Sequence, residues 1–362
     1  ILKSHDYTPT IGIKHMMTLA LPLGYEIFGL TQWSDAMGRH LFTGIGLADF
    51  SEKATHRFLL EYINAMGGPM WGIVATSLLD IKAKPYDGRA LLEENNSITL
   101  WATMPYNAGN NMSSNHTFGG SLEFTNRNAN IIKDIDEETG EFIYLDSIPH
   151  LELPVSGNEG LVSLIYMWID RRPHKQNGMN PRQGHGLNMQ IDHANSSLFG
   201  DFDYTRITTD MFINFLPHKK SPVVIFGRIK SVAMLGDTPP LQDMPAITND
   251  TPIYLAGSNI LGADEVFHLR GWDNWRLGDR LVIGTIESRM GGSKASLVAF
   301  LDFGNAWYAD GEMDDWLSTG GAELRVNLFG FVLAYGTGQD FNRWRDKEVP
   351  TNYLRLSLIN PF

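Results

Sequence analysis

Apolar and polar residues alternate along short segments throughout the chain. The segment 299–304 reads Ala-Phe-Leu-Asp-Phe-Gly, 187–192 reads Leu-Asn-Met-Gln-Ile-Asp, and 322–327 reads Ala-Glu-Leu-Arg-Val-Asn. Successive side chains of a β-strand point to opposite faces of its sheet, so each segment predicts a strand with one apolar and one polar face.

Sixteen candidate strands follow from this alternation when Gly, Pro, Asn and Asp are taken as their boundaries. They are 11–20, 23–34, 38–49, 55–63, 69–79, 95–104, 116–126, 159–169, 184–194, 202–213, 222–234, 280–290, 295–305, 319–327, 329–337 and 352–361. An even number of such strands is typical of a transmembrane barrel. We therefore predict an all-β fold, an antiparallel transmembrane β-barrel of about sixteen strands with lipid outside and polar side chains inside.

Composition agrees with spanning strands and excludes spanning helices. Apolar residues make up 43% of the chain, yet no run of eighteen of them occurs. In a barrel only alternate positions meet lipid, so the average composition resembles that of a soluble protein.

The connections between candidate strands alternate in length. If the first strand runs outward from the periplasm, the long ones are external, and they are 80–94, 127–158, 235–279, 306–318 and 338–351. The opposite side receives 105–115, 170–183, 291–294 and 329–330. Acidic residues dominate 127–158 and basic residues dominate 170–183, which adds a difference in charge between the two sides.

Loop 235–279 is long enough to predict a function of its own, and it carries the tetrad Leu269, Arg270, Gly271 and Trp272. The next candidate strand places Glu287 and Arg289 on one face. The strand after that contains Phe300-Leu301-Asp302-Phe303-Gly304.

These motifs resemble those of the bacterial surface-antigen superfamily, which includes BamA, TamA and the two-partner-secretion transporters. The tetrad is similar to the Val-Arg-Gly-Phe/Tyr sequence on the sixth external loop of that superfamily, with Trp272 in place of Phe or Tyr. The segment 300–304 is similar to its Phe-x-Asp-x-Gly strand motif. The segments 34–40, 62–64 and 71–72 look like the subgroup in which a periplasmic WD-type β-propeller precedes the barrel.

The resemblance implies that loop 235–279 folds into the lumen, where Arg270 reaches Asp302 and packs near Phe300. Gly271 would allow a tight reversal of the chain and Gly304 would leave room for it.

An arginine in a narrow lumen needs a carboxylate, and its planar fork can bind one through two hydrogen bonds. Glu287 and Glu323 also face inward, so they are expected to share Arg270 with Asp302. The contact is either a strut that holds the loop or a part that moves.

The last strand is expected to close the barrel. Its lipid face carries Leu354, Leu356 and Leu358, its inner face carries Tyr353, and the chain ends in the aromatic Phe362. Pro361 has no N–H group to donate, so this strand is expected to end early and to pair weakly with the first one.

We expect residues 1–362 to form a single barrel domain. Because the chain begins at Ile1, a signal peptide and a soluble periplasmic domain are expected upstream of it.

The sequence thus predicts a barrel of the bacterial outer membrane that acts as an anchor, or as a protein insertion or translocation module, for an upstream periplasmic domain. Expected partners are outer-membrane lipids, lipopolysaccharide, and periplasmic or surface proteins. One alternative is a passive channel whose ion preference is set by Glu287, Arg289, Arg325 and Arg355. Another is a soluble all-β binding domain, which would dissolve without detergent.

Several classes of function have no support in the sequence. It contains no His-Glu-x-x-His, no Gly-x-Ser-x-Gly and no glycine-rich phosphate loop, so we expect no enzyme activity and no cofactor or metal. The net charge of −12 argues against a nucleic-acid partner. The absence of cysteine excludes disulfides and thiolate ligands.

Overall fold

The computed structural model describes most of the chain. The described residues are 12–23, 25–50, 55–86, 89–106, 114–135, 142–144, 156–171, 181–236, 239–240, 243–248, 266–272, 276–311, 313, 315–328, 331–341 and 350–358.

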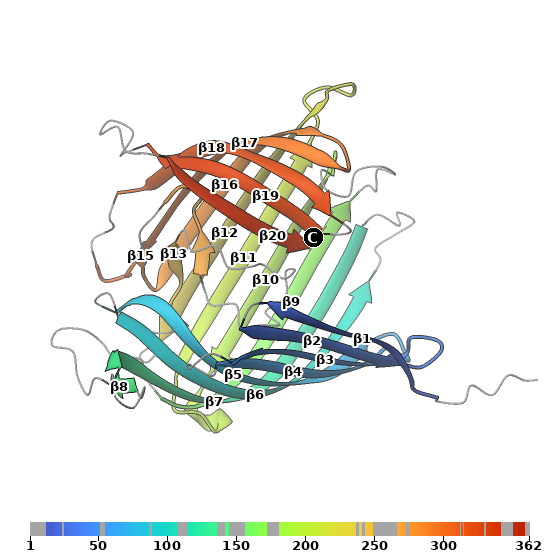
Figure 1. Ribbon diagram of the computed structural model, residues 1–362, viewed down its shortest axis with the longest axis vertical. Helices are drawn as coiled ribbons and strands as arrows, with labels where there is room; N and C mark the ends of the chain where they lie inside the picture. Colours follow the sequence, from blue (N-terminus) through green and yellow to red (C-terminus); the bar gives the residue numbers. More distant parts are fainter. Residues whose placement is uncertain are drawn as a thin grey trace, which may run out of the picture.

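Sixteen strands in the described part of the chain form one antiparallel sheet in chain order, each paired with the next (Figure 1). They are β1 Lys14–Leu23, β2 Glu26–Ser34, β3 His40–Asp49, β4 His56–Asn64, β5 Met70–Tyr86, β6 Arg89–Tyr106, β7 Ser114–Ile135, β9 Gly157–Arg171, β10 Gly184–Ala194, β11 Tyr204–Phe215, β12 Val223–Gly236, β16 Arg280–Gly291, β17 Ala295–Trp307, β18 Leu317–Leu328, β19 Phe331–Asp340 and β20 Thr351–Leu358. Each candidate strand overlaps one of these, so the predicted all-β fold, strand number and strand order are confirmed.

The two faces of the sheet differ as the alternation predicts. On β17, Leu297 and Leu301 are about half exposed, at 51% and 50%, whereas Phe300 and Asp302 are 3% and 2% exposed. On β18, Leu324 is exposed while Glu323 and Arg325 are buried. A water-soluble sheet buries its apolar face, whereas this one buries charges and leaves leucines uncovered.

Three strands are much longer than predicted. β5, β6 and β7 have 17, 18 and 22 residues, whereas about 9–11 residues cross a bilayer. The prediction that 80–94 is an external loop is therefore wrong, and so is the beginning of the predicted loop 127–158. Neighbouring polar residues such as Glu93 and Glu94 place polar side chains on both faces of these extensions, so no apolar alternation marks them as strands.

Loop 235–279 contains a second, small sheet. β13 (Ala246–Thr248) pairs in parallel with β14 (Val266–His268) and antiparallel with β15 (Arg276–Leu277). Ile247, which is fully buried, joins a hydrophobic cluster with residues of the large sheet, namely Val232, Leu281, Ile283, Ala306 and Leu317. The loop therefore packs against one face of the large sheet, which we call the inner face.

The predicted closure of the barrel is not observed. Among the described residues, β1 pairs with β2 and β20 pairs with β19, and the two edge strands lie apart (Figure 1). Pro22 on β1 fits an edge, because proline cannot donate a hydrogen bond to a further strand.

The remaining described elements are small. β8 (Phe142–Tyr144) pairs with β7, and one short 3-10 helix covers Ser196–Leu198. None of the helices in the described ranges is long and apolar enough to cross a membrane.

Candidate functional site

The tetrad 269–272 forms a turn directly after β14. The backbone N–H of Trp272 donates to the carbonyl of Leu269 at 3.1 Å, and Gly271 has φ +86°. A Cβ at Gly271 would collide with the backbone of Gly338 and lie 2.6 Å from the nitrogen of Gln339 on β19. The turn therefore needs glycine both for its left-handed conformation and for its close approach to the sheet.

This turn directs Arg270 onto the inner face of β16, β17 and β18. Its guanidinium binds Asp302 through two hydrogen bonds, from Nε to Oδ2 at 2.7 Å and from Nη2 to Oδ1 at 2.6 Å. Nη1 donates to Glu287 at 2.7 Å and lies 3.5 Å from Glu323. The structure thus places Arg270 against all three carboxylates that the sequence analysis named.

Two further arginines complete the ionic network. Arg289 Nε donates to Glu287 at 2.6 Å, and Arg325 Nη2 donates to Glu287 at 2.8 Å. Arg325 also forms an ion pair with Glu323. Three guanidinium groups face three carboxylates, so the formal charges of the network cancel.

The charges of this network need to balance because its members are buried. Asp302, Glu287 and Glu323 are at most 4% exposed, and an unpaired charge in such a place is costly. Burial alone would lower the pKa of Arg270, but the negative charges of Glu287 and Asp302 outweigh it and raise that pKa well above its usual value. Arg270 is therefore a permanent cation.

Aromatic side chains surround the network and extend it to the edge strand. The Arg270 guanidinium lies 3.8 Å from the ring centre of Phe300, as a cation–π contact. Tyr353 on β20 donates its hydroxyl to Glu323 at 2.9 Å and meets Phe300 edge to face. The loop is thus connected through Glu323 to the last strand of the sheet. We call Arg270, Glu287, Arg289, Asp302, Glu323, Arg325 and Tyr353 the Arg270 cluster.

Glycines make space for these side chains on the inner face. A Cβ at Gly336 would lie 2.8 Å from Cε2 of the Tyr353 ring. A Cβ at Gly304 would lie 3.2 Å from Cδ1 of Ile247, a residue of the loop. Gly304 therefore leaves room for the loop.

The other residues that the sequence analysis named fall into three groups. Leu269 and Trp272 are buried in the hydrophobic cluster that also contains Ile247. Leu354 is exposed on the outer face. The side chains of Leu356 and Leu358, and the whole of Phe362, lie outside the described residues.

Sequence reasoning missed some members of the network. Arg325 was expected only to tune a channel, and Tyr353 only to close the sheet. Arg325 lies two residues after Glu323 on the same face of β18, so the alternation along that strand could have paired them. Tyr353 lies on β20, and nothing in the local sequence shows that its side chain meets Glu323. A second buried cluster, around Arg127, was missed as well.

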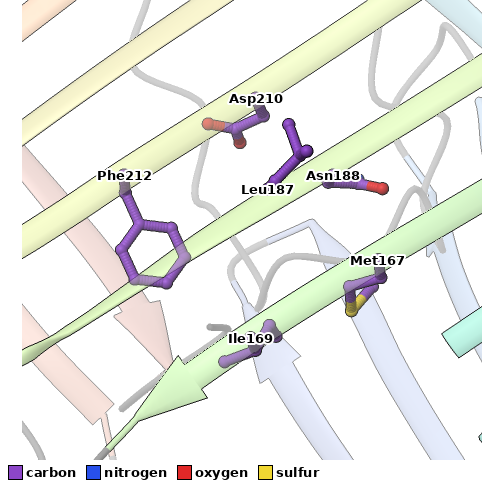
Figure 2. A pocket seen from close by; sticks show the side chains of 6 residues that line it. All are labelled: Met167, Ile169, Leu187, Asn188, Asp210 and Phe212. Atoms are coloured by element: carbon purple, nitrogen blue, oxygen red, sulfur yellow. The ribbon is translucent and has the colours of Figure 1, made fainter. Parts of the chain in front are cut away.

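Metal-type clusters and cavities are the remaining features of the described residues that bear on the site. No group of His, Cys, Asp or Glu among them has the arrangement of a metal site. A cavity of about 10 Å³ lies between Met167, Ile169, Leu187, Asn188, Asp210 and Phe212 (Figure 2). This is room for about one water molecule and too little for a substrate.

Comparisons with known proteins place the fold. The sequence matches no protein-family model and no curated protein. The structure is similar to the crystal structure of BamA from Haemophilus ducreyi lacking POTRA domains 1-3, with a TM-score of 0.60, 10% sequence identity, and coverage of 91% of this chain and 66% of that chain. It is also similar to CdiB from Acinetobacter baumannii, with a TM-score of 0.56, 11% identity, and coverage of 87% and 53%. This chain, which spans about two thirds and about half of these two proteins, has the fold that BamA and CdiB share.

Proposed function

We propose that this chain is an outer-membrane β-barrel of the surface-antigen superfamily and that it inserts or translocates proteins. In this proposal β1 and β20 meet to close the barrel, and loop 235–279 lies in its lumen. The barrel anchors an upstream soluble periplasmic domain, for which the segments 34–40, 62–64 and 71–72 suggest a β-propeller.

The observation that carries the proposal is the reversed distribution of polarity across the sheet. Large apolar side chains are exposed on the outer face of strand after strand, for example Leu100 on β6, Phe124 on β7, Ile191 on β10, Ile229 on β12 and Leu354 on β20. The inner face buries the ionic network. Lipid is the solvent that suits such an outer face, and in lipid an open sheet edge leaves its backbone groups unsatisfied. Both considerations favour a closed barrel in a membrane.

The docked loop favours a protein-handling role over a passive channel. Leu269, Arg270 and Trp272 are buried against the inner face, where a porin would keep an open path. The similarity to BamA and CdiB supports the same choice. Outer-membrane lipids and lipopolysaccharide are the partners that the outer face requires, and nothing in the site suggests an enzyme.

Reconstitution tests the proposal. The purified chain is refolded with lipid vesicles, and folding is followed by its shifted migration on an unheated denaturing gel. We expect folding that requires lipid or detergent, low conductance in planar bilayers, and faster insertion of a small client barrel into vesicles that contain the chain.

Vesicles containing Arg270→Ala chain provide the matched control for the client assay. A large and steady conductance without any effect on the client would favour the passive channel. A chain that folds and stays dissolved without lipid or detergent would overturn the membrane proposal altogether.

A further inference from the structure

A second buried ionic cluster joins the other end of loop 235–279 to a different part of the sheet. Arg127 on β7 donates from Nη1 to Asp243 of the loop at 2.6 Å and from Nη2 to Glu159 on β9 at 2.7 Å. Glu93 on β6 lies 3.9 Å from the same guanidinium, and Tyr204 on β11 donates its hydroxyl to Glu159. We call these five residues the Arg127 cluster.

Apolar packing accompanies this contact. Met244, the neighbour of Asp243, is 6% exposed and belongs to a hydrophobic cluster with Ile131, Leu161, Phe202 and Tyr204. The loop therefore contacts the wall formed by β7, β9 and β11 through one charged and one buried apolar side chain, Asp243 and Met244. It contacts the wall formed by β16, β17 and β18 in the same manner, through Arg270 and Leu269.

The small sheet connects the two contacts. Asp243 lies shortly before β13 and Arg270 shortly after β14, and β13 pairs with β14 in parallel. The described segments 243–248 and 266–272 are therefore held together by hydrogen bonds and form a strap between two walls of the sheet.

The charges at the two ends of the strap have opposite sign. The strap contributes a carboxylate at Asp243, where the wall supplies a guanidinium, and a guanidinium at Arg270, where the wall supplies carboxylates. A strap docked in the reverse orientation would place like charges together, which opposes that arrangement. The ion pairs thus define one orientation.

The two ends differ in how much they depend on the strap. Without Asp243, Arg127 keeps Glu159 and Glu93, so no buried charge is left alone. When Arg270 leaves, Asp302 loses two hydrogen bonds from the guanidinium and one from the backbone N–H of Arg270, and it keeps one from the hydroxyl of Thr285. The Asp243 carboxylate is also 19% exposed, whereas the Arg270 side chain is 8% exposed. In addition, three carboxylates share Arg127, and their repulsion opposes the docking of Asp243.

We propose that Asp243 and Met244 form a second docking site of the loop on Arg127, and that this end of the strap detaches from the sheet while the end at Arg270 stays bound. Release moves the first limb of the strap away from β7, β9 and β11 and opens the interior there. This gating role rests on the proposed barrel function, whereas the docking and its release do not.

Thiol labelling tests the release directly, because the chain has no cysteine of its own. Met244→Cys introduces one buried thiol, and its reaction with a maleimide is timed in detergent micelles. We expect Asp243→Asn to accelerate labelling of Met244→Cys about tenfold or more, as the loss of one charged hydrogen bond implies. Asp310→Asn, which neutralises an exposed aspartate in the external turn after β17, should leave the rate unchanged.

A second measurement does not need the introduced cysteine. In planar bilayers Asp243→Asn should open several times more often than the unaltered chain, while its unfolding temperature stays the same because Arg270 remains docked. Equal labelling rates with and without Asp243→Asn would overturn the docking proposal. Faster labelling without any change in conductance would leave the docking intact and overturn the gating role alone.

Discussion

The Arg270 cluster and the Arg127 cluster both bury charges where loop 235–279 meets the sheet, but they are built differently. Around Arg270, three guanidinium groups face three carboxylates, and Glu287 accepts hydrogen bonds from Arg270, Arg289 and Arg325. Around Arg127, one guanidinium faces three carboxylates. From this difference we expect that the balanced cluster is destabilised by the loss of any one charged member, whereas the acid-rich cluster tolerates the loss of one carboxylate.

Removal of Arg270 should have the largest effect. Arg270→Ala leaves Asp302 buried without a guanidinium, and breaking a buried ion pair from one side costs about 3–5 kcal/mol. We expect this loss in the free energy of unfolding, together with rapid proteolysis of the loop. Arg270→Lys keeps the charge but not the two-pronged geometry, so its loss should be intermediate. An unchanged unfolding curve and an unchanged digestion pattern for Arg270→Ala would contradict the contact.

Neutralising one glutamate in each cluster tests whether charge balance distinguishes the two clusters. Glu287→Gln leaves three buried guanidinium groups with two carboxylates and should cost about 3 kcal/mol. Glu159→Gln leaves Arg127 with Glu93 and Asp243 and should cost about 1 kcal/mol. Urea unfolding of the two variants in the same detergent measures both values. Equal losses would show that charge balance does not distinguish the clusters.

The turn that presents Arg270 can be tested without altering any charge. Gly271→Ala places a Cβ against the backbone of Gly338 and strains a residue at φ +86°, at a cost of about 1–3 kcal/mol. We expect the loop to become sensitive to protease while the strands stay folded. Gly292→Ala, where a Cβ meets nothing within 4 Å, is the matched control. A similar response of both variants would remove the special role of the turn.

The smallest expected effects concern the tyrosines that each cluster uses as a donor. Tyr353→Phe and Tyr204→Phe each delete one hydrogen bond to a glutamate, worth about 0.5–1.5 kcal/mol. Because Tyr353 lies on the edge strand, its loss should also speed hydrogen exchange in β20, whereas the loss of Tyr204 should not. Exchange in β20 that responds equally to both variants would contradict a link between the loop and the last strand.

Much of this fold could be predicted because its strands obey one simple rule. The segment 299–304 alternates so cleanly that its buried and exposed sides were both correct. The rule fails on the extensions of β5, β6 and β7, because polar side chains there, such as Glu93 and Glu94, occur on both faces. Pro361 predicted a weak pairing of the last strand with the first, but the fully open edge between β1 and β20 could not be foreseen, since pairing depends on the path of the whole sheet.

Only part of the ionic site could be predicted, and that part followed from a resemblance between motifs rather than from the alternation of residues. Arg270 and Asp302 were paired through a resemblance between motifs, and periodicity alone would not have joined them. The Arg127 cluster has no such motif, and the acidic segment 127–158 suggested a solvated loop. Its members lie on four separate elements, β6, β7, β9 and β11, and on the loop. Only the structure brings Arg127 and Asp243 together.

The proposed barrel requires that leucines on the outer face meet lipid while the ionic clusters lie within the barrel. Nitroxide labels on Leu297→Cys, Leu301→Cys and Leu324→Cys, compared in vesicles with a label on Tyr308→Cys in the exposed turn after β17, test this requirement. We expect the first three labels to collide mainly with lipid-dissolved oxygen and the fourth mainly with a water-soluble nickel complex. Four labels that respond alike, or leucine positions open to the nickel complex, would contradict it.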